Sequence, residues 1–258
     1  MMPGSERRVK VTEKQAKSVL NKSKVHDYCI NPYTGCSHDC VYCYAKLFMA
    51  RYSGHTEAWG TFVDVKVNAV ELLKRELPKA RKGTIWIASV CDPYQPLEKS
   101  YRLTRRLLEQ IVPWQFPVEI QTKSCLVVRD LDLLLRLENV SVGLTVPTDD
   151  PSVSRLFEPG ASPLEERLRA LEVLRQAGVR TFAFAGPLLP GNPERLAGLL
   201  ADKVGRVLID RMNYLPAVKG FYRRHKLEKY LSDDFFREQA GRLSRALTAA
   251  GVESETLF

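Results

Sequence analysis

Three cysteines lie close together near the start of the chain, at Cys36, Cys40 and Cys43, in the spacing C-x3-C-x2-C. The Asn-Pro pair at 31–32 and Gly35 favour tight turns that would bring the three thiols onto one small object. Thiolate ligands select zinc or iron–sulfur clusters among the biological metals. Structural zinc sites and electron-transfer clusters both take four protein ligands, so three cysteines leave one coordination position open to another ligand.

The sequence also offers a protein ligand for that fourth position, at Cys29, His26 or His38. A closed zinc site of four cysteines, or of three cysteines and one histidine, is therefore an alternative. It would make the chain a noncatalytic four-cysteine zinc module that binds nucleic acid. Cys29 lies beside Ile30 in an apolar segment, where a free cysteine is more often part of the core than a ligand.

Apolar runs and turn signals predict an alternation of short strands and helices along most of the chain. The expected strands are 28–30, 84–90, 118–122, 140–146, 181–185 and 204–210; the expected helices are 41–52, 103–111, 129–137, 163–176 and 193–201, with an extra strand 62–67 and helix 69–77 after the first unit. This alternation indicates an α/β fold with a parallel sheet in a wound or barrel architecture. Six such units are too few for a complete eight-fold barrel.

Two of the expected helices have distinctive ends. In the first, Ser162 as N-cap, Pro163 at the first helical position and Glu165 at the third form a capping box, and Gly178 follows the far end. The second, at 232–247, carries acids at its start and arginines later, as the helix dipole favours. We expect this second helix to close the fold.

Polar residues follow three of the expected strands. Asp92 comes after strand 84–90, Lys123 and Ser124 come after strand 118–122, and Thr145 lies near the end of strand 140–146. In β/α barrels the functional groups lie at the carboxyl ends of the strands and on the loops that follow them. The alternatives without a ligand are an Asp-Pro turn, a solvent-facing loop lysine and a packed strand threonine.

The cysteine motif, with Tyr42 directly before its third cysteine, resembles the signature of the radical S-adenosylmethionine (SAM) superfamily. The wider string NPYTGCSHDCVYCYA, followed by SVCDPYQPLEKSYRLTRRLLE and TKS, resembles the subfamily that includes spore photoproduct lyase and bacterial proteins called DNA repair photolyases. This resemblance covers about residues 25 to 210, which is most of the chain.

The resemblance implies a partial (β/α)6 TIM-like barrel over about 25–210 with a C-terminal helical extension over about 211–258, in a single domain spanning 1–258. It implies that Cys36, Cys40 and Cys43 bind a 4Fe-4S cluster whose fourth iron is chelated by the amino and carboxylate groups of SAM. One-electron reduction of SAM by an external donor, flavodoxin-like or ferredoxin-like, would then give methionine and a 5'-deoxyadenosyl radical that abstracts hydrogen from a substrate.

The same resemblance assigns cofactor contacts to single residues. Tyr42 matches the aromatic residue that neighbours the adenine, and Asp92 is the candidate for the SAM amino group. Lys123 would pair with the SAM carboxylate, Thr145 with that carboxylate or a ribose hydroxyl, and Glu158 also has a match in related chains. For Glu158 the alternative is a surface carboxylate near a helix start.

One departure from the subfamily bears on the reaction. Spore photoproduct lyase has a hydrogen-donating cysteine three residues before its Asp-Pro, and that position here is Ser89. Cys91 instead stands directly before Asp92, so we do not expect the lyase reaction itself. Cys91 is the candidate catalytic thiol, which would quench a substrate radical; the alternative is a buried thiol at the end of a strand.

The chain carries 39 basic and 30 acidic residues, a net charge of +9. The segment 219–226 gathers basic residues and two aromatics in an expected loop, and Arg102, Arg105 and Arg106 form a second basic patch. Basic groups neutralise phosphates and aromatic rings stack on unpaired bases, so nucleic acid is the favoured substrate class. A solvated surface, and a peptide or protein substrate for the same radical chemistry, are the alternatives.

Six cysteines in 258 residues, with 45% apolar and 27% charged residues, are typical of a globular chain that needs no disulfides. No apolar run approaches the roughly 20 residues of a membrane span, and residues 1–10 are polar and charged rather than a signal sequence. We therefore expect a cytoplasmic protein without membrane partners. The oligomeric state is unknown from the sequence.

Overall fold

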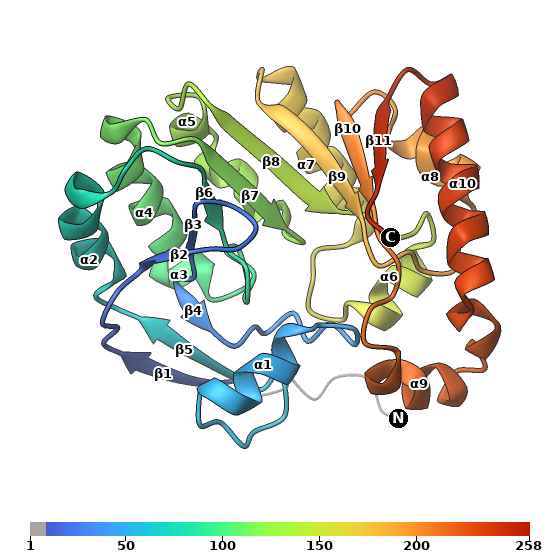
Figure 1. Ribbon diagram of the computed structural model, residues 1–258, viewed down its shortest axis with the longest axis horizontal. Helices are drawn as coiled ribbons and strands as arrows, with labels where there is room; N and C mark the ends of the chain where they lie inside the picture. The colour runs from blue at the N-terminus through green and yellow to red at the C-terminus, as the bar shows by residue number, and fades with distance from the viewer. Residues whose placement is uncertain (1–8) are drawn as a thin grey trace.

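The structure is a computed structural model that describes residues 9–258, apart from the side chains of residues 50 and 51. The polar start of the chain therefore lies almost entirely outside the described residues. The main sheet runs in the order β11-β10-β9-β8-β7-β6-β3-β2, and every neighbouring pair from β3 to β11 is parallel (Figure 1). Its strands are β2 (Leu20–Lys22), β3 (Tyr28–Ile30), β6 (Ile85–Ile87), β7 (Val118–Thr122), β8 (Val140–Thr145), β9 (Arg180–Ala185), β10 (Arg206–Ile209) and β11 (Glu253–Thr256).

All six predicted strands of the barrel are present in this sheet, and the α/β class with a partial TIM-like barrel is confirmed. Strand β6 is shorter than predicted because the backbone N–H groups of Ser89 and Val90 are bound by the Asn31 side chain instead of a neighbouring strand. The sheet also gains an edge strand at each end, antiparallel β2 beside β3 and parallel β11 beside β10. The barrel stays open between β2 and β11.

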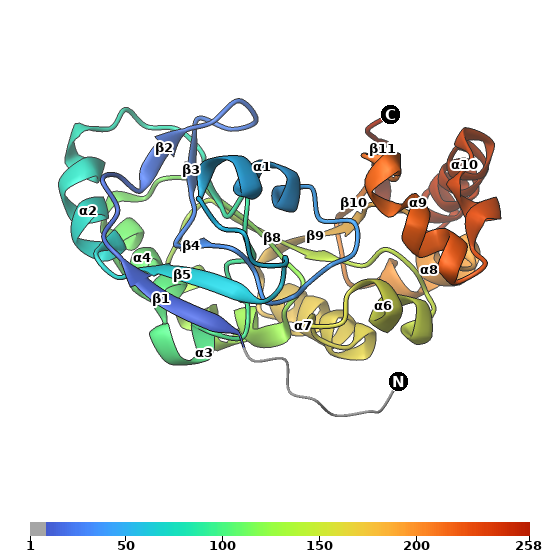
Figure 2. The same cartoon turned by 90° about the horizontal axis from the view of Figure 1, so that it is seen from below.

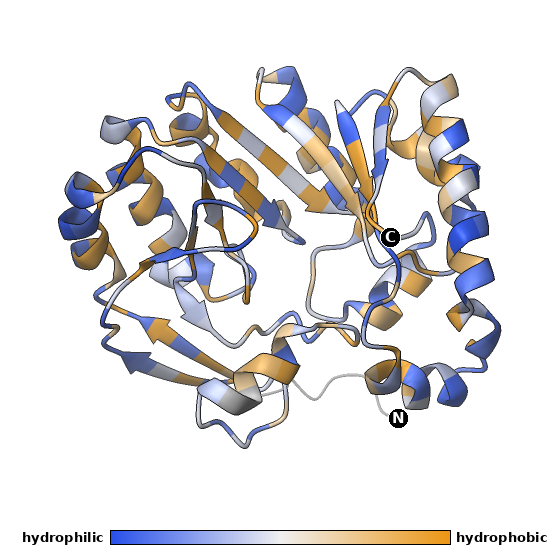
Figure 3. Ribbon diagram, in the orientation of Figure 1, coloured by the Kyte–Doolittle hydropathy of each residue, from blue (hydrophilic) through white to orange (hydrophobic). Residues whose placement is uncertain are grey.

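Helices lie outside the curved sheet and bury their apolar faces against it, as the colouring of Figure 3 shows. They are α2 (Ala69–Glu76), α3 (Glu98–Tyr101), α4 (Leu103–Ile111), α5 (Leu131–Leu134), α6 (Pro151–Phe157), α7 (Leu164–Gln176), α8 (Pro193–Leu200), α9 (Leu215–Arg224) and α10 (Asp233–Ala249), with α1 (Ala45–Tyr52) after the cysteines. Of the helix expected at 129–137, only the single turn of α5 is α-helical; the 3-10 helix Cys125–Asp130 precedes it.

The extra strand expected after the first unit forms, but it does not join the barrel. It is β5 (Phe62–Lys66), which pairs with β1 (Lys10–Lys14) on one side and β4 (Tyr33–Thr34) on the other. Figure 2 shows this small sheet beside the barrel, under α1. Because β4 belongs to the segment that leads into the cysteines, the small sheet supports the base of the cysteine loop.

The predicted capping box of α7 is wrong. Pro163 occupies the N-cap position and makes no side-chain cap, while the Ser162 hydroxyl accepts a hydrogen bond from the backbone N–H of Cys125 at 3.0 Å. The far end is as predicted, since Gly178 has a φ of +90°. The closing helix is also confirmed as α10, where the Ser232 hydroxyl caps the N–H of Phe235.

Two expectations about basic segments are corrected. Segment 219–226 lies mostly in helix α9 rather than in a loop, because Val218 and Tyr222, one turn apart, are buried and hold that face against the fold. In the second patch, Arg105 pairs with Asp130 at 3.1 Å and with Asp132 at 2.7 Å, so it contributes no free charge. Within residues 9–258 no helix is long and apolar enough to cross a membrane.

Candidate active site

The three motif cysteines lie on the loop between β4 and α1, at the carboxyl ends of the parallel strands. All three line one cavity of about 300 Å³. Burial raises the pKa of each thiol above its ordinary value. Such thiols stay protonated until a bound cation stabilises the thiolate, so the loop is suited to hold a metal group rather than free thiolates.

This arrangement fits a cluster better than a single ion. Among the described residues, no three Cys, His, Asp or Glu side chains are grouped to share one metal ion. Cys29 accepts a hydrogen bond from the Asn31 amide at 3.6 Å. It does not line the cavity that the other three thiols face. Cys29 therefore lies outside the donor set, whereas His26 and His38 line the same cavity, so a site of three cysteines and one histidine stays an alternative. Three thiols spread around one cavity are the donor set that a 4Fe-4S cluster with one open iron requires.

The loop after β6 clamps the cysteine loop. Gln95 is fully buried; its Oε1 accepts from the Ser37 backbone N–H at 3.0 Å and its Nε2 donates to the Gly35 carbonyl at 3.3 Å. Asn31 adds a second tie through its Oδ1, which accepts from the N–H groups of Ser89 and Val90 at 2.9 Å. Gln95 and Asn31 both lie inside the quoted motifs. Nothing in the sequence marks the residues that they bind, because each of them lies about sixty positions from its partner.

A third contact comes from the loop after α6. The N–H of Gly160 donates to the His38 carbonyl at 3.0 Å. A Cβ on this glycine would lie 2.4 Å from the Ser37 carbonyl oxygen and 2.8 Å from the His38 Cα. Only a residue without a side chain therefore fits beneath the cysteine loop at this position.

Asp92 lies in the wall of the cavity, and its carboxylate is already engaged. Its Oδ1 accepts from the Thr122 hydroxyl at 2.6 Å and the Tyr94 N–H at 2.9 Å, and its Oδ2 accepts from the Lys123 N–H at 2.8 Å. His38 Nδ1 lies 3.3 Å from Oδ2. Burial acts to raise the pKa of Asp92, but His38, the Thr122 hydroxyl and Lys123 together hold it well below its ordinary value. The residue is a fixed negative charge, and its contact with SAM stays a prediction.

Lys123 and Thr145 come together as predicted, on the ends of β7 and β8. Lys123 Nζ lies 3.4 Å from the Thr145 hydroxyl and 5.6 Å from the centre of the Tyr42 ring. Both residues line the cavity of the cysteines. Burial acts to lower the pKa of Lys123, but Cys40 in its thiolate form and the carboxylates of Glu158 and Asp92 outweigh it and raise the pKa. A cation is thereby held beside the thiols.

Glu158 is placed behind Tyr42 rather than on the cavity of the cysteines. Its Oε1 accepts the hydrogen bond of the Tyr42 hydroxyl, and its Oε2 pairs with Arg167 at 2.5 Å. Both charged residues are about 1% exposed. Arg167 also donates to the carbonyls of Thr145 and Ser162, at 2.9 and 2.7 Å. Glu158 thus positions the ring that the sequence assigns to the adenine, a role that the sequence did not suggest, and its own contact with the cofactor stays a prediction.

Cys91 and Ser89 both line the cavity of the cysteines. Cys91 is partly buried, and burial raises the pKa of its thiol to about 12. Its Sγ lies 3.9 Å from the Oδ1 of Asn31. The Nδ2 of the same side chain donates a hydrogen bond to the Ser89 hydroxyl at 3.1 Å. The thiol is therefore neutral and faces the cavity. Its catalytic role stays a prediction.

A second cavity of about 700 Å³ adjoins the first and shares Cys40, Cys43, Tyr44 and Lys123 with it. Its far wall is the segment from Asp210 to Tyr214 after β10, which the sequence analysis did not single out. At its rim, ring contacts link Tyr44 to Phe48 at 6.1 Å and Phe48 to Tyr214 at 6.5 Å. We call these three exposed rings the aromatic ladder; they are 38%, 42% and 47% exposed.

The open side of the barrel also borders this site. Val25, in the turn between β2 and β3, and Leu257, just after β11, both line the first cavity. Both side chains are largely exposed. The site is therefore reached from the side of the barrel as well as from the carboxyl ends of its strands.

Comparisons with known proteins agree with this geometry. The family model described as the Radical SAM superfamily matches residues 30–201. An uncharacterised protein of Methanocaldococcus jannaschii is 36% identical over 185 residues, covering 71% of this chain and 69% of that protein. A protein of Pseudomonas phage M6, named radical SAM Nalpha-GlyT isomerase, is 25% identical over 242 residues, covering 88% of this chain and 49% of its own length.

Among solved structures, spore photoproduct lyase superposes with a TM-score of 0.69 at 17% identity, covering 96% of this chain and 82% of that chain. A structure of that enzyme with bound AdoMet and dinucleoside spore photoproduct gives a TM-score of 0.68 at 16% identity, with the same coverage. At these identities the likeness concerns the fold.

Proposed function

The chain belongs to the radical SAM superfamily, and on that premise we propose that it is an enzyme that binds a 4Fe-4S cluster through Cys36, Cys40 and Cys43 and cleaves SAM reductively. The observation that carries the proposal is the cavity at the strand ends, into which these three thiols and Lys123 face together. When bound, the cluster and SAM supply a 5'-deoxyadenosyl radical that abstracts hydrogen from a substrate.

Each of three side chains at the site is proposed to bind a different group of SAM. Lys123, held as a cation beside Thr145, attracts the SAM carboxylate. Asp92 keeps its charge, and its Oδ2 has capacity for a further hydrogen bond from the SAM amino group. Tyr42, fixed through Glu158, offers a ring face to the adenine. We propose that a flavodoxin-like or ferredoxin-like donor in the cytoplasm supplies the electron.

Nucleic acid is the proposed substrate class. The aromatic ladder offers exposed ring faces at the rim of the second cavity, and helix α9, directly after Tyr214, presents Lys219, Arg223 and Arg224 to solvent. Rings that stack on bases beside cations that neutralise phosphates are the usual elements of a surface for unpaired nucleotides. Cys91 is proposed to return a hydrogen atom to the substrate radical.

The metal content separates this proposal from a zinc module. Anaerobically purified and reconstituted protein is expected to hold about four iron and four sulfide per chain. Cys36→Ala, Cys40→Ala and Cys43→Ala should each lose the iron, whereas Cys29→Ala and Cys125→Ala, which change thiols outside the three, should keep it. Stoichiometric zinc without visible absorption would overturn the proposal.

The reaction is tested on the same preparation. Dithionite-reduced protein is expected to convert SAM to 5'-deoxyadenosine, and SAM deuterated at the 5' position should exchange label with the right substrate. Single-stranded DNA, RNA and peptide are compared in parallel. Tyr214→Ala and Phe48→Ala should each weaken oligonucleotide binding by about 1–3 kcal/mol, while Trp114→Ala, an exposed ring elsewhere, should not. Exchange with peptide alone would reject nucleic acid as the substrate.

A further inference from the structure

A third cavity, of about 650 Å³ and lined by polar residues, lies at the opposite end of the barrel, where the parallel strands begin. The first residues of β7, β8, β9, β10 and β11 and the last turn of α7 contribute to its wall. The amino ends of barrel strands ordinarily contribute stability rather than chemistry. An open cavity lined with charged groups at this end is therefore a candidate binding site.

The lining of this cavity carries an excess of positive charge. Arg175, Arg180 and Arg206 face two carboxylates, Glu119 and Glu253. Glu119 is already neutralised, because it lies between His26 at 3.4 Å and Arg206 at 3.5 Å. Arg175 and Arg180 remain, opposed only by Glu253 within the described lining.

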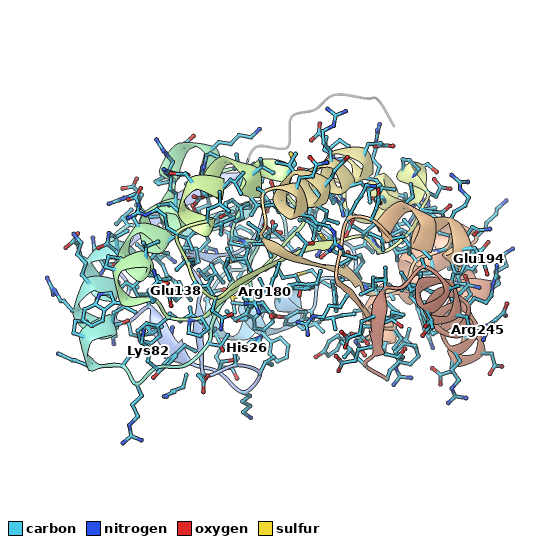
Figure 4. All side chains as sticks on the ribbon, turned by 90° about the horizontal axis from the view of Figure 1, so that it is seen from above. His26, Lys82, Glu138, Arg180, Glu194 and Arg245 are labelled. Atoms are coloured by element: carbon cyan, nitrogen blue, oxygen red, sulfur yellow. The ribbon has the colours of Figure 1, made fainter. Side chains whose placement is uncertain are left out.

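The two remaining guanidinium groups have donors to spare. Arg180 donates its Nε to the Val140 carbonyl at 3.2 Å and its Nη2 to Asn139, which leaves Nη1 without a partner among residues 9–258. Arg175 lies within electrostatic reach of Asp202, whose carboxylate is not part of the cavity lining. Figure 4 shows Arg180 close to His26 at this end of the molecule. Each guanidinium carries five N–H donors in a fixed fork that matches the oxygens of a phosphate.

Strand register places Arg180, Glu119, Arg206 and Glu253 on one inner face, and Arg175 borders the same cavity from the last turn of α7. Arg180 pairs across the sheet with Ser141, and Ser141 pairs with Glu119. On the neighbouring strands, Arg206 pairs with Glu253. Paired residues point to the same side of a sheet, so these side chains converge on the lumen.

We propose that this cavity is a second binding site, for the phosphate group of a small molecule, held by Arg175 and Arg180. It goes beyond the proposed radical chemistry, which takes place at the other end of the barrel. The two cavities share His26 and Glu119 in their walls, so the occupant lies directly behind the cavity of the cysteines.

Calorimetric titration of the full chain, reconstituted with its cluster, tests the site without SAM cleavage. Inorganic phosphate and adenosine 5'-monophosphate are titrated in parallel, with chloride at matched ionic strength as the baseline. We expect saturable binding at one site per chain. Tighter binding of the nucleotide would assign the phosphate to a nucleotide, and tighter binding of inorganic phosphate would assign it to the free ion.

Variants that remove a positive charge and a variant that removes a negative charge should change phosphate affinity in opposite directions. Arg180→Gln and Arg175→Gln should each weaken phosphate binding at least tenfold, while Glu253→Gln, which removes the opposing charge, should strengthen it severalfold. Arg175 and Glu253 are exposed, so their variants keep the test valid even if Arg180→Gln does not fold. Arg245→Gln on α10, away from the cavity in Figure 4, is the control and should change nothing. Binding that is unsaturable, or equal in all four variants, overturns the proposal.

Discussion

The hydroxyl of Tyr42 donates a hydrogen bond to the buried carboxylate of Glu158, a residue 116 positions later in the chain. Through this bond and the pairing of Glu158 with Arg167, the loop of the cysteines is tied to the start of helix α7. The aromatic ring beside the three motif cysteines is therefore held by an ion pair that has no access to solvent. Removing either charge leaves the other one buried without its ion-pair partner.

Glu158→Gln is expected to lower the free energy of unfolding by about 3–5 kcal/mol, because Arg167 then stays buried without a counter-charge. Urea unfolding at neutral pH measures this loss. Glu165→Gln, an exposed carboxylate in the first turn of α7, is the control and should change stability by about 0.5 kcal/mol or less. Equal losses in the two variants would show that the ion pair contributes nothing.

The same pair predicts a pH dependence. Burial acts to raise the pKa of Glu158, but Arg167, Lys123 and the Tyr42 hydroxyl outweigh it, so the pKa lies below its ordinary value of 4.5. A carboxyl whose pKa is lower in the folded state stabilises the fold fully above its unfolded pKa. The stability gap between wild type and Glu158→Gln should therefore be constant above about pH 5 and close as the pH falls below 4.5. A gap that widens in acid would contradict the assignment.

Gly160→Ala is expected to displace the cysteine loop, since the new Cβ would lie 2.4 Å from the Ser37 carbonyl oxygen. Overpacking of this kind costs about 1–3 kcal/mol, and we expect the iron content after reconstitution to fall with it. Gly198→Ala in helix α8 is the matched control, because no atom lies within 4 Å of its new Cβ. That variant should keep its iron and gain up to about 1 kcal/mol from helix propensity.

Asp92→Ala and Lys123→Ala are expected to weaken SAM binding. A hydrogen bond to a charged group is worth about 1.5–3 kcal/mol, which corresponds to a roughly ten- to hundredfold higher Kd for each variant. Equilibrium dialysis of the reconstituted, unreduced protein measures that Kd directly. Lys82→Ala, which removes a lysine away from the cavity, should bind SAM like the wild type. Unchanged affinity in both site variants would reject these cofactor contacts.

Local patterns in the sequence predicted the parallel α/β sheet and the grouping of the three cysteines, while the partial barrel followed from the family resemblance. The six parallel strands are apolar runs with clear punctuation, and the cysteine spacing is contained in one short loop. Asp92, Lys123 and Thr145 could be placed because strand ends of a parallel sheet lie along one edge. The basic composition of segment 219–226 favours a loop, but Val218 and Tyr222, one helical turn apart, indicate a helix with one buried face.

The contacts that hold the loop could not be predicted, because each joins residues far apart in sequence. Gln95 reads as an ordinary loop glutamine, and only the fold places it under Ser37. Ser162 failed as a cap because its hydroxyl is taken by the N–H of Cys125, on another loop. Strands β4 and β11 are too short and too polar to show a period of two, and they form because a neighbouring strand offers them backbone partners.

The unclosed seam between β2 and β11 affects which molecules can react. In a closed barrel the lumen sets an upper limit on the size of a substrate, because the whole molecule must pass through the mouth. Here Val25 and Leu257 border the cavity from the two free edges of the sheet. If the substrate is the nucleic acid proposed above, one of its residues could enter sideways while the rest of the polymer stays outside, and selection would then act on that residue and its flanks rather than on molecular size.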